Sequence, residues 1–247
     1  MEKNKMNKDG EIYLFCFPHA GGWPSIYGMW ELWISSKIVV APIQLPGRGE
    51  RLDEEPLEDF NYLIKDIVQE VKKYVGSRIA FYGSCFGGLC AFEVARKMVE
   101  INNVKIEHLF ISSQAAPSLE NSSKHLSDLK EEQFVQELIL EGALSEKILE
   151  DKEILDILVP SLRSDYKMYD NYTYMKARKK LECPITVFKG KSDESVTMET
   201  MKEWAKETTG EFKFLEISGK HLFNKIEQRV IVEEISKTLL KEDGEWI

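Results

Sequence analysis

The chain has 247 residues, of which 43% are hydrophobic and 30% charged, and its formal net charge is -9. This composition predicts a globular protein with one substantial core, and the negative charge argues against bulk binding to nucleic acid or to an anionic membrane. No apolar run is long enough to span a bilayer and no signal peptide precedes the first strand-like run, so we expect a cytoplasmic protein.

Strand-like and helix-like segments alternate along the first half of the chain. Four apolar, strand-like runs lie at 11–17, 37–43, 79–82 and 107–113. Apolar residues recur at helical spacing in 58–75 and 87–101. Strands that alternate with helices predict an α/β fold with a mostly parallel central sheet and helices on both faces.

The first two strands each end in a loop of distinctive composition. Pro18-His19-Ala20-Gly21-Gly22 follows the first strand, and a glycine-rich loop there can supply backbone N–H groups to an oxyanion. The loop 44–51 follows the second strand and carries Arg48 and Arg51. These arginines could bind an anion, but we favour the interpretation that they brace the loop through Glu50 and Asp53.

The third strand leads directly into Gly83-x-Cys85-x-Gly87 and a helix. This order is typical of a nucleophile elbow, in which a reactive side chain sits at the apex of a strained turn and glycines relieve crowding on either side. Ser84 would not fit the apex, because Tyr82 and Phe86 would then occupy the glycine positions. The frame therefore predicts Cys85 as the nucleophile.

The other three cysteines are expected to be free thiols with packing roles. Cys16, Cys90 and Cys183 are scattered, and no cysteine lies in a CxxC pair or a His/Cys cluster with zinc-ligand spacing. The sequence therefore predicts neither a disulfide framework nor a metal site.

The alternation of strands and helices stops after residue 117. Residues 118–180 show helical periodicity, which predicts a helical lid insertion at about 118–182 within a single domain spanning 1–247. A Tyr/Met-rich stripe at 166–175 either packs the lid on the core, which we favour, or lines an acyl-binding cleft. A basic cluster at 176–180 is a solvated face or a contact for an acidic partner.

The last part of the chain supplies candidates for a base and its orienting acid. Strands are expected at 183–190 and 211–217, and helices at 197–208 and 226–241. Asp193 follows the first of these strands and His221 the second, whereas the other three histidines lie in less suitable places. The order nucleophile, acid, histidine is that of α/β-hydrolases, so we predict a Cys85–His221–Asp193 triad, with Glu194 as the alternative acid.

Six motifs in order along residues 11–240 resemble the type II thioesterases of nonribosomal peptide and polyketide synthesis. They are Pro18-His19-Ala20-Gly21-Gly22, Leu45-Pro46-Gly47-Arg48-Gly49-Glu50-Arg51, Gly83-x-Cys85-x-Gly87-Gly88, Arg163-Ser164-Asp165-Tyr166, Gly190-x-x-Asp193 and Gly219-Lys220-His221-Leu222-Phe223.

The resemblance implies an α/β-hydrolase that hydrolyses acyl or aminoacyl groups from phosphopantetheine thiols. It implies an oxyanion hole made by the backbone N–H groups of Ala20 and Phe86. The implied partners are acyl or peptidyl carrier proteins, and the implied oligomeric state is a monomer. No cofactor of the enzyme itself is expected, because the substrate carries the phosphopantetheine.

Cys85 departs from the serine that most members of this family carry. A helix N-terminus and a neighbouring imidazole both favour a thiolate, and attack on a thioester then exchanges one thioester for another. The resulting acyl-cysteine could pass its acyl group to an amine, alcohol or thiol, so an acyltransferase or cyclase is the main alternative to hydrolysis. A non-catalytic carrier-binding module is a second alternative.

Overall fold

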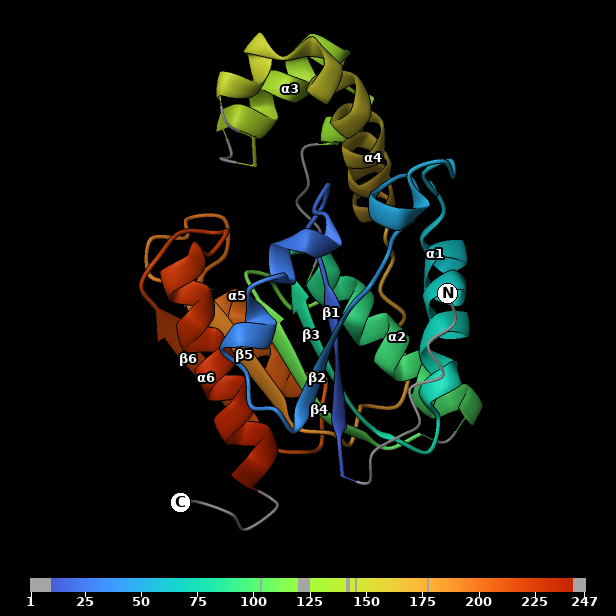
Figure 1. Cartoon of the computed structure of the whole chain (residues 1–247), viewed down its shortest axis with the longest axis vertical. Helices are drawn as coiled ribbons and strands as arrows, with labels where there is room; N and C mark the ends of the chain where they lie inside the picture. The colour runs from blue at the N-terminus through green and yellow to red at the C-terminus, as the bar shows by residue number, and fades with distance from the viewer. Residues whose placement is uncertain are drawn as a thin grey trace.

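The computed structural model describes residues 10–102, 104–119, 125–140, 143–144, 146–176 and 178–241. In these ranges six parallel strands form one sheet in the order β2-β1-β3-β4-β5-β6 (Figure 1). The strands are β1 (Ile12–Phe17), β2 (Ile38–Pro42), β3 (Arg78–Ser84), β4 (Ile106–Ser112), β5 (Ile185–Gly190) and β6 (Phe212–Ile217). The predicted α/β fold with a parallel sheet is confirmed.

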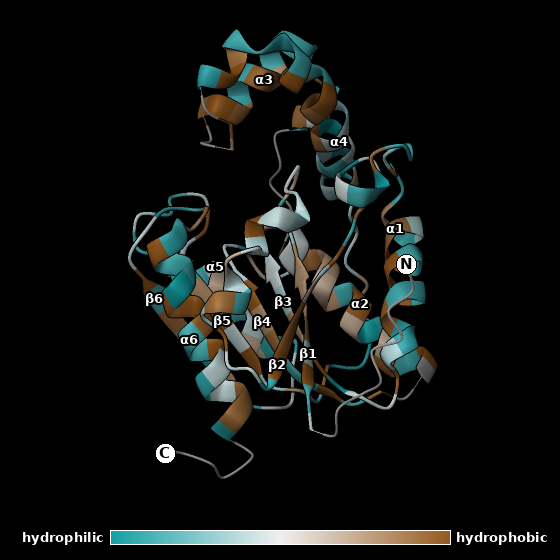
Figure 2. Cartoon of the chain, in the orientation of Figure 1, coloured by the Kyte–Doolittle hydropathy of each residue, from teal (hydrophilic) through white to brown (hydrophobic). Residues whose placement is uncertain are grey.

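Helices cover both faces of this sheet. The helices are α1 (Phe60–Val71), α2 (Phe86–Asn102), α3 (Glu131–Leu140), α4 (Lys152–Asp170), α5 (Met198–Lys202) and α6 (Lys225–Lys241). The alternation of side chains along β1 explains the two layers, because Phe15 packs with residues of α1 and α2, whereas Leu14 packs with residues of α6. Figure 2 shows hydrophobic strands between helices of mixed hydropathy.

The boundaries predicted from the sequence agree with the structure to within about two residues, with two exceptions. Helical spacing was expected over 58–75, but α1 ends at Val71 and a 3₁₀ turn follows over Lys72–Tyr74. A single helix was expected at 197–208, but α5 ends at Lys202 and a 3₁₀ turn continues over Glu203–Lys206. Trp204 in this turn is fully buried, and its indole N–H donates to the carbonyl of Gln114 at 2.7 Å. We attribute the change from α-helix to 3₁₀ turn to the packing of the Trp204 side chain.

The described residues between β4 and β5 contain helices and short 3₁₀ turns and no regular strand. We call this part of the chain the lid segment. Its helices α3 and α4 share a small apolar cluster, separate from the two clusters on the sheet, that includes Phe134, Leu138, Val159 and Leu162. Figure 1 shows α3 and the start of α4 beyond the carboxyl ends of the strands. None of the helices in the described ranges has the length and apolar character needed to cross a bilayer.

Candidate active site

The turn between β3 and α2 holds Cys85 in a strained backbone conformation. Its φ of 51° lies in the left-handed region, which is costly for a residue other than glycine. A Cβ on Gly83 would lie 2.2 Å from the carbonyl oxygen of Gly87, and a Cβ on Gly87 would lie 2.3 Å from that of Phe17. Both glycines are therefore required by close backbone approach, as the elbow interpretation anticipates.

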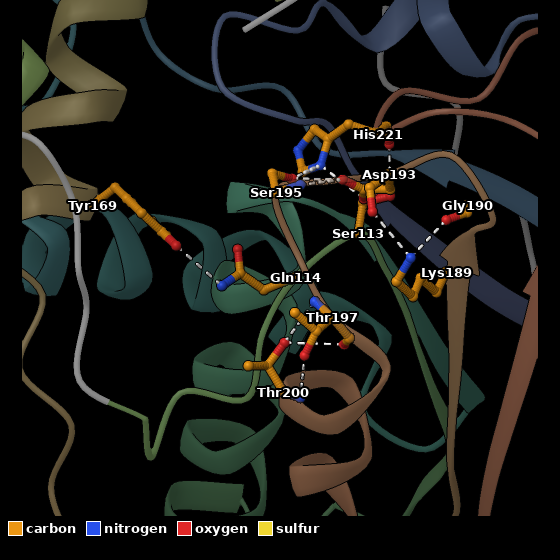
Figure 3. Close-up of polar contacts among 10 residues, drawn as sticks. All are labelled: Ser113, Gln114, Tyr169, Lys189, Gly190, Asp193, Ser195, Thr197, Thr200 and His221. Atoms are coloured by element: carbon orange, nitrogen blue, oxygen red, sulfur yellow. Dashed lines mark hydrogen bonds and ion pairs between the residues drawn. The ribbon is translucent and has the colours of Figure 1, made fainter.

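Asp193 and His221 meet beside this turn, although 28 residues separate them. They follow β5 and β6, two neighbouring parallel strands, whose carboxyl ends lie at the same edge of the sheet. The Asp193 Oδ2 atom is 3.0 Å from His221 Nδ1 (Figure 3). Glu194, the alternative acid, is exposed and forms no hydrogen bond with His221 in the described residues. The structure thus pairs His221 with Asp193.

Ser195 joins this pair and was not anticipated from the sequence. Its hydroxyl donates to Asp193 Oδ1 at 2.6 Å, which leaves its oxygen to accept from His221 Nδ1, 2.7 Å away. Two acceptors at Nδ1 place the proton there and leave His221 Nε2 for the sulfur. The Ser195 N–H also donates to Asp193 Oδ1, an Asx turn that the Asp-x-Ser spacing could have suggested.

Further hydrogen bonds fix the two loops that carry the acid and the base. The buried Lys189 ammonium donates to the carbonyl oxygens of Gly190 and Asp193 at 2.9 and 3.0 Å. The Ser113 hydroxyl, at the end of β4, donates to the carbonyl of His221 at 2.6 Å. Figure 3 shows these bonds around the Asp193–His221 pair. The two loops are therefore held by backbone contacts as well as by their side chains.

The surroundings of His221 strongly favour its protonated form. Burial lowers the pKa of His221, but the negative charge on the Cys85 sulfur and hydrogen bonds to Asp193 and Cys85 outweigh it and raise the pKa to about 10. For Asp193 the effects have the opposite sign. Burial raises its pKa, but hydrogen bonds to His221 and Ser195 outweigh burial and lower the pKa below its usual value. The site therefore favours an imidazolium at His221 beside an ionised Asp193 carboxylate.

The remaining cysteines and histidines lack this environment. Cys85 is half-buried, whereas the other three thiols are buried, and burial raises their pKa values. The buried His108 has a pKa lowered to about 4 by burial and by Lys213, and it contacts Thr186 at 2.8 Å. His19 Nδ1 lies 2.9 Å from the Ala20 carbonyl. Within the part of the chain that the structure describes, His221 is the histidine that pairs with a carboxylate.

The two residues predicted to form an oxyanion hole, Ala20 and Phe86, line the cavity that Cys85 and His221 share. Phe86 opens α2, and the first N–H groups of a helix have no partner within it. The N–H of Ala20, in the loop after β1, donates no hydrogen bond within the described ranges. Both residues line the cavity with Cys85. Their position at the cavity wall is compatible with the predicted oxyanion hole.

The loop that carries Ala20 is held by a buried ion pair that the sequence did not reveal. Arg48 donates two hydrogen bonds to Asp165, of 2.6 and 2.8 Å, and both side chains are almost fully buried. The N–H of Gly21, next to Ala20, donates to the same carboxylate at 2.8 Å. Asp165 of α4 thereby ties the lid segment to the loops after β1 and β2.

The expectation that Glu50 and Asp53 brace the two arginines was wrong. Arg48 pairs with Asp165, and Arg51 pairs instead with Glu54 and Asp66. The helical turn at Gly49–Arg51 directs the Arg51 side chain across the loop and towards α1, where Asp66 lies. Local sequence distance was therefore a poor guide to the partners of these two guanidinium groups.

A cavity of about 590 Å³ is lined by Cys85, Asp193 and His221 and by residues of the lid segment. Tyr166 and Tyr169 of α4 line it, whereas Tyr172 and Tyr174 bond to Glu93 of α2 and to Glu207. The Tyr/Met stripe thus serves both of the roles considered, because its first half faces the cavity and its second half packs on the body of the domain.

The basic cluster at 176–180 does not line this cavity. Arg178 pairs with Glu93 at 2.6 Å, and the lysines at 176, 179 and 180 are exposed. This arrangement leaves the three lysines open to solvent or to an acidic partner.

Comparisons with known proteins agree with this geometry. A family model for the thioesterase domain matches residues 13–239. Over 88% of its length the chain is 36% identical to the gramicidin S biosynthesis protein GrsT of Aneurinibacillus migulanus, of which it covers 85%. It resembles the structure of BorB, a type II thioesterase from the borrelidin biosynthetic cluster, with a TM-score of 0.84, 30% identity and 94% of each chain covered.

A second solved structure, ClbQ from the colibactin NRPS/PKS pathway, gives a TM-score of 0.89 at 26% identity, with 94% of this chain and 98% of that chain covered. The family match and the fold together define a thioesterase of α/β-hydrolase architecture. The chain belongs to the thioesterase family, and within it to the type II thioesterases, as the ordered motifs suggested.

We expect Asp165→Asn to destabilise the protein by about 3–5 kcal/mol, because the buried Arg48 guanidinium would lose its counter-charge. Urea denaturation of wild type and variant measures the change. Lys167→Ala is the matched control on the same helix, since it removes an exposed pair with Glu58 that should contribute at most about 1 kcal/mol. Equal losses in the two variants would contradict the role given to the buried pair.

We expect Cys85→Ser to lower the pKa of His221, because a neutral hydroxyl removes the negative charge that raises it. The wild-type imidazole should remain protonated at pH 8, below its pKa of about 10. In the variant it should lose its proton at a lower pH. NMR titration of the imidazole resonances measures both values, and an unchanged pKa would show that the sulfur carries no charge beside His221.

Proposed function

We propose that the protein hydrolyses acyl or aminoacyl groups from the phosphopantetheine thiols of carrier proteins in nonribosomal peptide or polyketide synthesis. The proposed catalytic residues are Cys85, His221 and Asp193. The observation that carries this proposal is the placement of His221, which interacts with the Asp193 carboxylate on one side and the Cys85 sulfur on the other. A nucleophile, a base and an orienting acid in contact satisfy the requirement for covalent catalysis.

In the first half of the reaction, the Cys85 thiolate attacks the carbonyl carbon of the substrate thioester. A bond forms between this carbon and the sulfur, and the oxyanion accepts hydrogen bonds from the N–H groups of Ala20 and Phe86. The carbon–sulfur bond to the pantetheine then breaks, and the departing thiolate takes a proton from the His221 imidazolium. The products are an acyl-cysteine and a free carrier thiol.

Acylation prepares His221 for the second half. The acyl-cysteine carries no negative charge, so one of the causes that raise the pKa of His221 disappears with it. The neutral imidazole accepts a proton from water, and the hydroxide attacks the acyl-cysteine. The sulfur leaves as a thiolate and the acid is released, which restores the ion pair. Asp193 and Ser195 hold the ring in one tautomer and orientation throughout.

The carrier-bound nature of the substrate rests on the relatives. GrsT is named for gramicidin S biosynthesis, and ClbQ belongs to an NRPS/PKS pathway. BorB is a type II thioesterase of a biosynthetic cluster. A release or editing role in such a pathway is the corresponding proposal for this chain.

Acyl transfer is the second candidate, and Cys85 favours it. An acyl-cysteine is itself a thioester, so its acyl group retains the energy needed to react with an amine, alcohol or thiol. The half-buried sulfur lies in a cavity large enough for such an acceptor. The two candidates share the first half of the reaction and differ in what attacks the intermediate.

Intact-mass analysis with an acylated carrier protein tests both candidates. We expect the enzyme mass to rise by one acyl group on Cys85, and the released product to be the free acid if water is the acceptor. Cys85→Ala should abolish turnover, whereas Cys85→Ser should keep some hydrolysis and weaken acyl transfer. Substantial turnover by Cys85→Ala would exclude the covalent role, and a carrier that binds without turnover would indicate a binding module.

We expect the protein to prefer an acyl-pantetheine over the matched oxygen ester. A thiolate attacking an oxygen ester must expel an alkoxide, which is the poorer leaving group of the two, so the intermediate reverts to substrate. Steady-state kcat/KM values for the two esters measure the preference. A faster reaction with the oxygen ester would contradict the thioesterase assignment of this site.

A further inference from the structure

Gln114 is a buried polar residue in the wall of the cavity that the triad does not use. It lies two residues after the end of β4, its exposed fraction is 6%, and it lines the same cavity as Cys85 and His221. Its backbone is held in place by the hydrogen bond that its carbonyl accepts from the Trp204 indole at 2.7 Å. A buried amide at the wall of a cavity requires partners for both of its ends.

The nitrogen end of the amide has such partners, and they fix its orientation. The Gln114 Nε2 atom donates to the Ala115 carbonyl at 3.1 Å and lies 3.4 Å from the Tyr169 hydroxyl. A carbonyl oxygen can only accept, so the nitrogen, and not the oxygen, must occupy this end. The amide cannot be turned over without placing two acceptors in contact.

The oxygen end is without a partner. Gln114 Oε1 accepts no hydrogen bond from the described residues, and Figure 3 shows it on the side of the amide that faces Ser195 and His221. Solvent in the cavity can reach this oxygen, but an acyl group that covered it without donating a hydrogen bond would leave it unpaired at a cost. The partner that suits it is a hydrogen-bond donor on a group that enters the cavity.

The rest of the wall indicates where this donor is carried. A Cβ on Gly88, in the first turn of α2 after Cys85, would lie 3.2 Å from Gln114 Cβ, so the base of the Gln114 side chain packs against the helix that follows Cys85, and both residues line one cavity. Leu140, Ala143 and Val196 add apolar surface to the cavity. An acyl group that fills this wall would be mostly apolar, with one donor near its thioester carbonyl.

We infer that Gln114 is a specificity residue that selects acyl groups bearing an N–H or O–H donor next to the thioester carbonyl, as in aminoacyl and hydroxyacyl groups, over plain acyl groups. This inference rests on the proposed function and refines its substrate class. A plain acyl group would bury Oε1 without a partner, and sites with a buried polar group reject ligands that cannot pair with it.

The test compares alanyl-, lactoyl- and propanoyl-pantetheine, which differ only in carrying an amine, a hydroxyl or neither beside the carbonyl. We expect wild-type kcat/KM to be higher for a donor-bearing group than for propanoyl by about 10-fold or more. Gln114→Met keeps the length of the side chain and removes the acceptor, so this ratio should fall towards one. Gln114→Leu serves as a second variant, and the alanyl and lactoyl arms show which donor is preferred.

Val196→Ala is the matched control, because it changes the cavity without touching the acceptor. It should alter kcat/KM for the three substrates by similar factors and leave their ratios unchanged. A ratio that is unaffected by Gln114→Met would overturn the inference. Equal losses for all three substrates would do the same, since they would indicate that Gln114 contacts the amides of the pantetheine arm.

Binding measurements separate this inference from the proposed function. Calorimetry with the non-hydrolysable amides of alanine, lactate and propionate on aminopantetheine gives dissociation constants that need no turnover. A donor preference that Gln114→Met removes, in a protein that hydrolyses none of the thioesters, would refute the proposed function alone. Hydrolysis of all three thioesters with no donor preference in binding or turnover would refute the inference alone.

Discussion

The arrangement of the site depends on the buried ion pair between Arg48 and Asp165. Two charges taken out of water are tolerated only when each satisfies the other with good geometry, and the bidentate pair does this within 2.8 Å. The same carboxylate accepts the N–H of Gly21, so the loop after β1 cannot shift without breaking this partly buried hydrogen bond. The position of Ala20, and with it one half of the proposed oxyanion hole, follows from a contact made on the other side of the loop.

The ion pair also couples the lid segment to the catalytic loops. Asp165 and the two cavity-lining tyrosines, Tyr166 and Tyr169, belong to one stretch of α4. A helix presents neighbouring residues in different directions, so α4 can send its carboxylate into the body of the domain and its aromatic rings into the cavity. A movement of α4 that reshaped the acyl-binding wall would therefore also disturb the loop that carries Ala20.

The chemistry of the proposed triad depends on where negative charge lies during the reaction. His221 stands between the Cys85 sulfur and the Asp193 carboxylate, and Ser195 supplies a second acceptor to its Nδ1. When the sulfur is a thiolate, the imidazolium is favoured and can protonate the departing carrier thiol. When the sulfur is acylated, that stabilisation is lost and the neutral ring can activate water or another acceptor. One residue thus serves both halves of the reaction.

Much of the fold and of the proposed triad could be predicted from local sequence, because local rules govern those features. The spacing of apolar residues indicates the strands and helices. The two glycines around Cys85 are needed because the backbone is crowded at the turn. Asp193 and His221 follow successive parallel strands, which places both at one edge of the sheet.

The partners of Arg48, the contact of Ser195 with His221 and the free acceptor of Gln114 were decided only by the tertiary structure. Arg48 and Asp165 are 117 residues apart, and the sequence around each residue does not indicate that the other is its partner. The contacts between buried charges and amides depend on how whole helices and strands pack together. The spacing of neighbouring residues in the sequence does not predict these contacts.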